Sequence, residues 1–413
     1  MRISRRVALS AGAGGLLLAA APGVRLAWTG RSADQSRGGG RDILVFVFLR
    51  FGLDGLTLLA PSEDDNYLKA RPTVAVTAET GLAIGALDGV PFYLHPAAVE
   101  LKALFDEGKL AFIHAAGVPT GSRSHFEVQE MAERGICERE APLIGGWLAR
   151  HLLNGGGDAV PELGAVAAAA QIHTALHGFR GAIAIPDVAK FNVSGGDFNL
   201  NVIEALSAGS EPHAVSARET VGMIREVRRR FAELGSATGD GGAYPVGEFG
   251  TAMQSLAQMI KMGSGVEVAT VDYGGWDHHY KMNQYFPGHA AHLAQTLAAF
   301  WNDLADYQDR LTVVAMTEFG RRLQENTAGG TDHGAASVML ALGGGVRGGR
   351  IYGAWPGLGP GDLRDGDVRV TTDSRHILQE ILVNRRGETA LAAVFPGVPY
   401  QPLGLVRRSN SMA

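Results

Sequence analysis

The chain has 413 residues and a net charge of −5, and charged residues make up only 19% of it. This length allows a large core in one domain or two, and the lack of a basic stripe argues against a nucleic-acid surface. The single cysteine, Cys137, excludes an internal disulfide and a cysteine-based structural zinc site. Its acidic neighbour Glu138 also makes Cys137 a poor nucleophile.

Residues 1–30 form a predicted targeting segment rather than part of the fold. Arg5 and Arg6 precede a moderately apolar stretch, 8–21, which is shorter than the roughly 20 apolar residues of a membrane span. The pattern resembles a twin-arginine export signal; an ordinary secretory signal or a basic helix are the alternatives. We expect a periplasmic or secreted protein that uses the twin-arginine export machinery and has no stable membrane anchor. Residues 31–41 are interpreted as a flexible lead-in.

Apolar runs alternate with helical periodicities along the rest of the chain. Strands are predicted at 42–49, 110–117, 266–271, 311–316 and 337–342, and helices at 97–108, from about 124, and at 214–234, 246–262, 288–309 and 374–386. The segment 150–215 gives the weakest signals, with a short strand near 182–186, and is interpreted as an insertion or a cap over the site. This alternation favours one α/β domain, 42–405, built as a three-layer α/β/α sandwich around a mostly parallel sheet.

Acidic residues and histidines lie beside glycines just after three of the predicted strands. Ligand sites of open parallel sheets form at the carboxyl ends of strands, and carboxylates and imidazoles are the ligands that divalent metals use. The pattern therefore indicates a metal-dependent hydrolase. The candidate metal ligands are Asp54, Asp277, His279, Glu318, Asp332 and His333.

Each candidate has a structural alternative. Asp54 could stabilise its own turn, Glu318 could pair with a neighbouring arginine, and the histidines at 278 and 279 could be solvated loop residues. Asp277 and His279 are the strongest pair, because residues two apart in an extended segment point to the same side.

The segment 121–126 is expected to join the second strand to a helix. Ser122 and Ser124 are candidate nucleophiles there, because a helix N-terminus stabilises an alkoxide. Arg123 could grip a phosphate or sulfate oxygen, and His125 could be a ligand or a base. The alternative for Ser124 is a plain helix N-cap, since Ser124 and Glu127 have the spacing of a capping box.

Taken together, the motifs resemble the DUF1501 family from about residue 42 to about residue 400. They are Gly-Leu-Asp-Gly at 52–55, Leu-His-Pro at 94–96, Ser-His-Phe at 124–126, Gly-Gly-Trp-Asp-x-His at 274–279, Thr-Glu-Phe-Gly-Arg at 317–321 and Gly-Thr-Asp-His-Gly at 330–334. That family is grouped with the alkaline phosphatase-like superfamily, which includes the sulfatases. The resemblance implies the three-layer fold and usually two divalent metals.

Within the superfamily pattern, Asp54 matches the early ligand, Ser122 or Ser124 the nucleophile region, and Asp277 with His279 the middle pair. The end of the chain departs from the pattern, because Glu318 stands where an Asp-His pair is usual. Asp332-His333 then stands either for that late pair or for the final histidine. We therefore expect one or two divalent metal ions, with zinc, manganese or calcium as candidates. The sulfatase signature that supplies formylglycine is absent.

The function expected from these observations is an exported metal-dependent hydrolase of phosphate or sulfate esters, with small-molecule or polymer substrates. A serine or a metal-activated water would be the nucleophile. One alternative is a non-catalytic exported binding or assembly protein with a degraded metal site on the same fold. A further alternative is a metal-dependent hydrolase that acts on polymer or glycan acyl groups.

Overall fold

The structure is a computed structural model, and it describes residues 41–138, 143–154, 163–237 and 243–409. The predicted export signal and all but the last residue of the lead-in lie outside these residues. Within the described ranges, no helix combines the length and the apolar character needed to cross a membrane.

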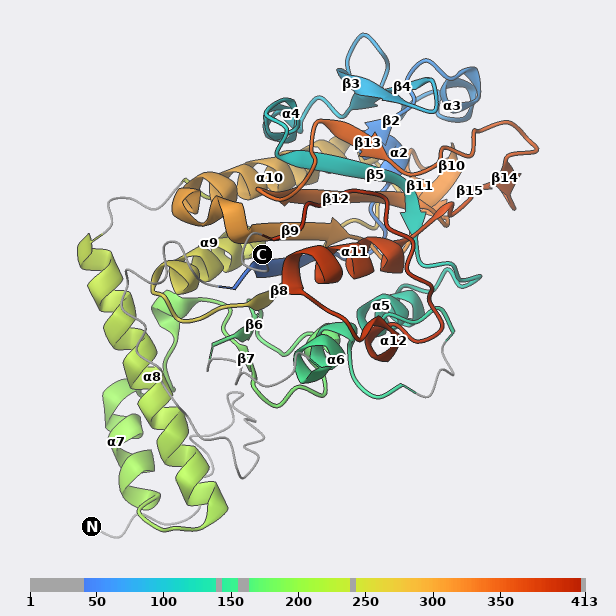
Figure 1. Cartoon of the computed structure of the whole chain (residues 1–413). Helices are drawn as coiled ribbons and strands as arrows, with labels where there is room; N and C mark the ends of the chain where they lie inside the picture. Colours follow the sequence, from blue (N-terminus) through green and yellow to red (C-terminus); the bar gives the residue numbers. More distant parts are fainter. Residues whose placement is uncertain (1–40, 139–142, 155–162, 238–242, 410–413) are drawn as a thin grey trace.

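A nine-stranded sheet with the order β13-β5-β12-β9-β1-β8-β6-β7, with β16 beside β5, forms the centre of the molecule (Figure 1). Its strands are β1 (Ile43–Leu49), β5 (Leu110–Gly117), β6 (Ala165–Ala167), β7 (Ala182–Ala184), β8 (Val268–Tyr273), β9 (Leu311–Met316), β12 (Ser337–Gly343), β13 (Arg350–Tyr352) and β16 (Thr372–Asp373). β1 is parallel to β8 and β9, and β12 is antiparallel to β9 and β5. The carboxyl ends of β1, β5, β8 and β9 therefore share one edge with the start of β12.

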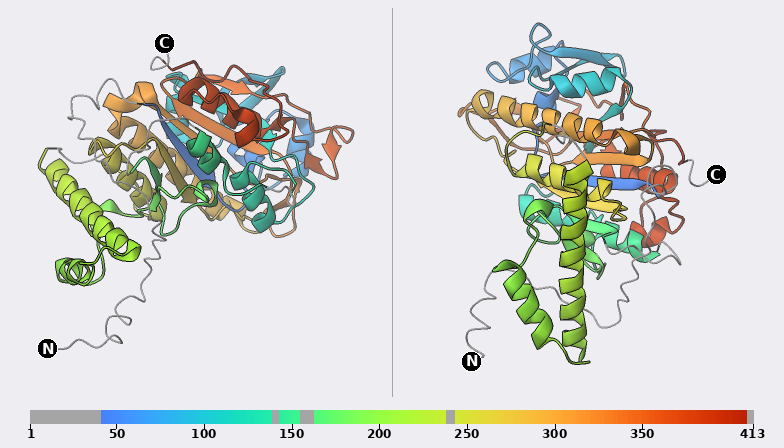
Figure 2. Two further views of the ribbon diagram at one scale, coloured as in Figure 1. Left: turned by 60° about the horizontal axis from the view of Figure 1, so that its bottom comes forward. Right: turned by 90° about the vertical axis from the view of Figure 1, so that its left-hand side faces the viewer.

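Helices cover both faces of this sheet (Figure 2). Along β1, Val45 and Val47 pack into one apolar cluster, and Phe46 and Phe48 pack into the other, as expected for a strand buried on both faces. The three-layer α/β/α prediction is confirmed. One face carries α4 (Val99–Asp106), α9 (Glu248–Lys261) and α10 (Met282–Asp303), and the other carries α5 (His125–Arg134), α6 (Trp147–Asn154), α11 (Ser374–Arg386) and α12 (Leu391–Val394).

The sequence does not predict the short elements outside the central sheet, because their pairings are long-range or their residues show no clear apolar alternation. These elements form one three-stranded sheet, two two-stranded sheets and two short helices. The elements are β2 (Leu59–Ala60), β3 (Leu82–Leu87) and β4 (Val90–Leu94); β10 (Arg321–Glu325) and β11 (Thr331–His333); β14 (Leu363–Arg364) and β15 (Asp367–Val368); and the helices α2 (Gly55–Leu58) and α3 (Asp65–Ala70).

The weakly patterned segment 150–215 extends the sheet and then leaves it. It supplies β6 and β7, the 3-10 turns η1 (Thr174–Leu176) and η2 (Val188–Lys190), and the helix α7 (Gly196–Leu206). With α8 (Pro212–Ala237), α7 forms a hairpin that projects from the molecule on the side opposite β10 and β11 (Figure 1).

The predicted helix 288–309 differs most from the structure. α10 begins at Met282 and contains Pro287, which a sequence-based reading takes as a helix boundary. The helix ends before Leu304, whose backbone is not helical, and a separate 3-10 turn, η3 (Ala305–Arg310), follows. The remaining predicted strands and helices are confirmed with boundaries shifted by a few residues.

His114, buried in β5, makes the stability of the fold depend on pH. Its Nε2 donates to the Leu59 carbonyl over 2.9 Å and its Nδ1 accepts from the Ala115 amide, so the ring is neutral. Burial lowers the pKa of His114 from 6.5 to about 4. Between pH 6.5 and pH 4 the unfolded chain binds a proton at His114 and the folded chain does not. The unfolding free energy is therefore highest, with respect to this group, above pH 6.5, and by pH 4 it is lower by about 3 kcal/mol.

We expect His114→Gln, which keeps a donor for Leu59, to have a flatter dependence of unfolding free energy on pH across that window than the unchanged protein. Urea unfolding at several pH values measures this dependence. His213→Gln, on the exposed surface of α8, is the matched control. Equal slopes for all three proteins would contradict the assignment.

Candidate metal centre

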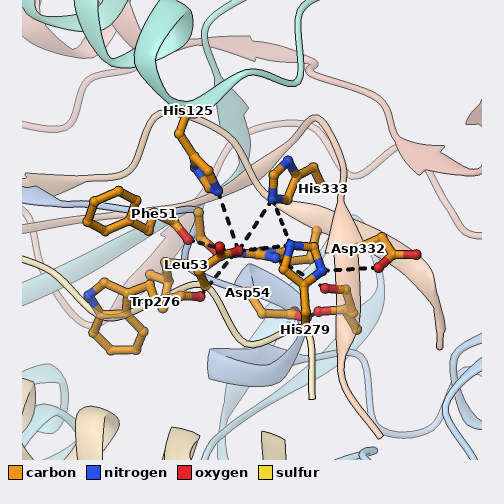
Figure 3. A network of polar contacts seen from close by, with 12 residues as sticks. Phe51, Leu53, Asp54, His125, Trp276, His279, Asp332 and His333 are labelled. Carbon is orange, nitrogen blue, oxygen red and sulfur yellow. Dashed lines mark hydrogen bonds and ion pairs between the residues drawn. The ribbon is translucent and has the colours of Figure 1, made fainter. Parts of the chain in front are cut away.

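Three imidazoles and one carboxylate meet at the sheet edge where β1, β8 and β9 end. His125 is the first residue of α5, which follows β5, and His333 is the last residue of β11, just before β12. Asp277 and His279 follow β8. Figure 3 shows the rings of His125, His279 and His333 turned toward one another. The segments after β5 and β8 and the end of β11 therefore lie together at one edge of the sheet.

The spacing of the ligand atoms suits a metal ion. Asp277 Oδ1 lies 3.4 Å from His125 Nε2, 3.0 Å from His279 Nε2 and 3.3 Å from His333 Nε2. The ligand atoms of His125, Asp277 and His333 all lie within 4.8 Å of one another. Ligands at about 2.0–2.1 Å from a tetrahedral ion lie about 3.3 Å apart, so the ligand atoms of His125, Asp277 and His333 have a spacing that suits one ion. His279 Nε2 lies beside two of these atoms, those of Asp277 and His333.

In each of the three imidazoles, Nδ1 lies within hydrogen-bond distance of an oxygen atom on the side away from the centre. Because the oxygen accepts, Nδ1 carries the proton, and in this tautomer the lone pair of Nε2 faces the centre. The contacts are His125 Nδ1 to Glu318 Oε1 at 2.7 Å, His279 Nδ1 to Asp332 Oδ1 at 3.1 Å, and His333 Nδ1 to the Arg123 carbonyl at 2.9 Å.

The protein atoms alone do not satisfy this arrangement. His279 Nε2 and His333 Nε2 lie 2.9 Å apart, and His125 Nε2 is buried without a hydrogen-bond partner. Three lone pairs and a carboxylate oxygen directed at one region repel one another unless a cation lies between them. The residues therefore fit a divalent metal. A set of three nitrogens and one oxygen suits zinc or a similar transition metal better than calcium.

Arg321 fixes the loops that carry the centre. Its buried guanidinium donates to Asp277 Oδ1 over 2.7 Å. Burial opposes ionisation of Asp277, but the hydrogen bond and charge of Arg321 outweigh it and lower the pKa of Asp277 to about 2. Asp277 is thus an anion at neutral pH. The remaining partners of Arg321 are the carbonyls of Phe51, Gly52, Trp276 and Thr331.

Glu318 and Asp332, both predicted as metal ligands, contact the Nδ1 atoms of His125 and His279 in this structure. The fully buried Glu318 accepts from the Phe51 amide and from Gln129, both at 2.9 Å, as well as from His125. The exposed Asp332 accepts from Asn326 as well as from His279. Neither carboxylate belongs to the cluster of His125, Asp277 and His333. His279 is not a member of that cluster either, but its Nε2 lies 3.0 Å from Asp277 Oδ1 and 2.9 Å from His333 Nε2.

Asp54 also lies outside that cluster. Its carboxylate is buried, accepts from Arg71 Nη1 over 3.0 Å, and accepts from the Thr57 amide and the Thr331 hydroxyl. Burial opposes ionisation of Asp54, but the charge of Arg71 and these hydrogen bonds outweigh it and lower the pKa. This geometry matches the alternative weighed from the sequence, an aspartate that stabilises its own turn, with a buried arginine added.

The serines lie at the start of α5 in different environments. Ser124 is the N-cap, yet its side chain makes no capping hydrogen bond. Ser122 Oγ instead donates to Glu127 Oε2 over 2.7 Å and accepts from the Ser124 amide. The expected capping box between Ser124 and Glu127 is therefore not formed. Arg123 donates from Nε to Asp367 over 3.0 Å.

A buried polar network extends from the centre along one face of α5. Gln129 and Glu133 follow His125 at four-residue intervals, which places all three on that face. Gln129 accepts from Arg50 over 3.1 Å, and Glu133 pairs with Arg50 and with His173. This spacing was visible in the sequence, whereas the partners come from distant segments.

The description of the family model that matches the chain is "Protein of unknown function (DUF1501)", and the matched residues are 201–389. The resemblance to DUF1501 is confirmed. Asp277, His279 and His333 lie within the DUF1501 match, whereas His125 precedes it. No curated protein matches the chain significantly.

Among solved structures, a sulfatase from Pseudoalteromonas sp. is 10% identical, with 91% of this chain and 75% of that one covered at a TM-score of 0.40. A phosphonate monoester hydrolase from Silicibacter pomeroyi is 10% identical, with coverages of 87% and 77% and a TM-score of 0.37. Its counterpart from Agrobacterium radiobacter is 10% identical, with 88% and 79% covered and a TM-score of 0.38. At this distance the activities of these proteins carry no conclusion about this chain.

Proposed function

We propose that this protein is an exported metal-dependent hydrolase of phosphate or sulfate esters, with one ion held by His125, Asp277, His279 and His333. The observation that carries the proposal is the direction of three Nε2 atoms at a single carboxylate oxygen, with every Nδ1 fixed by an oxygen behind it. Export rests on the sequence of residues 1–30.

A bound ion would supply a Lewis acid for an ester oxygen and lower the pKa of a nearby hydroxyl group. Glu318 and Asp332 keep the rings of His125 and His279 in the tautomer that such an ion needs. The first amides of α5 point toward the region before His125, where they favour negative charge. Asp277 stays ionised through Arg321 and orients its oxygen at all three rings.

Ser124 is the nucleophile that we propose. It immediately precedes His125, and its hydroxyl is not used to cap the helix. The hydroxyl of Ser122 is already committed to Glu127. Ser124 Oγ would lose its proton to solvent and bond to the phosphorus or sulfur atom as the bond from that atom to the ester oxygen breaks, and the alcohol leaves with a proton from solvent. Water would then hydrolyse the seryl ester to free serine and phosphate or sulfate, and the helix amides would stabilise the negative charge that develops in both steps.

Metal analysis of the purified protein together with turnover of aryl phosphates, phosphodiesters and aryl sulfates tests the proposal. We expect about one equivalent of a transition metal, such as zinc or manganese, and turnover that a chelator abolishes and the added metal restores. Absence of both bound metal and turnover would refute the proposal. Bound metal without turnover of any ester would favour the alternative, an exported binding or assembly protein.

We expect Ser124→Ala to lower kcat by about 10²-fold or more while retaining the metal, because it removes the attacking oxygen and leaves the four ligands intact. Ser122→Ala should reduce kcat by less, since its hydroxyl supports the loop through Glu127. Steady-state kinetics and metal analysis of both variants provide the comparison. A larger loss for Ser122→Ala would reverse the assignment of the nucleophile.

A further inference from the structure

Two arginines beside the metal centre share one carboxylate. Asp367, in β15, is 4% exposed and accepts from Arg123 Nε over 3.0 Å, and its other oxygen lies 3.4 Å from Arg322 Nε. The side chains of Arg123 and Arg322 are 40% and 38% exposed. One carboxylate balances only one of the two positive charges. We call Arg123, Arg322 and Asp367 the arginine clamp.

The arginine clamp flanks the centre on the side of β10 and β11. The carbonyl of Arg123 itself accepts from His333 Nδ1, and Arg123 directly precedes Ser124 and His125. Arg322 contacts the same carboxylate as Arg123, that of Asp367. The backbone of Arg123 therefore borders the centre, and both guanidinium groups lie at Asp367, one arginine side chain away from that backbone.

Hydrogen bonds hold both arginines of the clamp in place, but they do not use all of the N–H donors of the two guanidinium groups. Arg322 Nη2 also donates to the Asp365 carbonyl, and Arg123 contacts Asp367 through both Nε and Nη2. The Nη1 groups of Arg123 and Arg322 have no hydrogen-bond partner in the described part of the chain. Arginines whose rotamers are already fixed by a buried acid lose little entropy on binding an anion.

We propose that the arginine clamp binds a second anionic group of the substrate, a phosphate, sulfate or carboxylate near the ester that is hydrolysed. This inference rests on the proposed function. Such a group would meet the free Nη1 donors in charge-assisted hydrogen bonds. Asp332, which is exposed at the rim of the centre, would otherwise repel it. The substrate class is therefore an ester with an additional negative charge, as in a polyanionic polymer or a small dianionic molecule.

The test compares two aryl phosphates that differ only by a carboxylate on the leaving group. The metal-loaded protein should prefer the carboxylated ester, mainly through a lower KM. Arg322→Gln should reduce the ratio of the two kcat/KM values about tenfold, the effect of losing one charge-assisted hydrogen bond. Arg322→Lys should restore part of it. Arg350→Gln is the matched control, because Arg350 pairs with Ala111 near the other end of β5 and is exposed.

A second readout does not require turnover. By calorimetry, inorganic pyrophosphate should bind the metal-loaded protein more tightly than phosphate, and Arg322→Gln should reduce this difference. If the protein hydrolyses both esters but the ratio and the pyrophosphate preference are the same in Arg322→Gln, the arginine clamp is refuted and the hydrolase proposal stands. If no ester is hydrolysed, the hydrolase proposal fails. Equal affinities for phosphate and pyrophosphate would then refute the clamp as well.

Discussion

Asp277→Ala is expected to remove the bound metal ion and to lower turnover by at least about 10³-fold, since several kcal/mol of transition-state stabilisation depend on the ion. Asp277 supplies the only carboxylate oxygen of the proposed set, and that oxygen lies within 3.4 Å of all three Nε2 atoms. Without it, the three imidazoles face the positive charge of Arg321, which further disfavours a cation. Metal analysis and steady-state kinetics measure both effects.

The fold of this variant should persist, because Arg321 keeps four carbonyl partners. Circular dichroism can verify this. Asp306→Ala, at an exposed position in η3, is the matched control and should behave like the unchanged protein. A folded Asp277→Ala protein with a full equivalent of metal and undiminished turnover would eliminate the metal centre as described.

Asp54→Asn is expected to lower the unfolding free energy by about 3–5 kcal/mol and to leave the metal content unchanged. The change removes the charge that balances Arg71, and both side chains are buried, with exposures of 1% and 0%. An uncompensated buried charge has a cost of this size. Urea unfolding gives the free energy, and metal analysis gives the stoichiometry.

Asp65→Asn is the matched control for this experiment. Asp65 pairs with Lys69 on the surface of α3, where the two side chains are 84% and 76% exposed. Loss of such a pair should cost less than about 1 kcal/mol. The opposite result for Asp54→Asn, a stable protein that has lost its metal, would show that Asp54 is a ligand, as the sequence pattern alone predicts.

The parts of the fold that could be predicted are those in which local pattern and tertiary burial agree. β1 and β9 are continuous apolar runs and are buried along their whole length. The start of α5 was predictable from Ser124 and its surroundings. The meeting of the segments after β1, β5, β8 and β9 follows from the parallel arrangement, because carboxyl ends of parallel strands share one edge.

The roles of the individual acids could not be predicted, because distant partners decide them. Glu318 accepts from the amide of Phe51, which lies 267 positions earlier in the chain, and from His125, 193 positions earlier. Asp54 forms an ion pair with Arg71, which lies in the segment that connects α3 to β3, and that segment contains no recognisable motif. The sequence indicates Arg321 only as a neighbour that could pair with Glu318. In the structure, Arg321 in β10 is paired with His333 in β11, and its guanidinium donates to Asp277.

The ligands of the proposed ion come from segments that only the finished tertiary structure brings together. His125 is oriented by Glu318, 193 positions away, and His333 is oriented by the Arg123 carbonyl, 210 positions away. A nascent or partly assembled chain presents at most the local pair Asp277 and His279, which is too few ligands for firm capture. Ion loading is thus a late event in maturation. If export occurs in the folded state, the compartment where synthesis takes place, rather than the destination, selects which metal the protein carries.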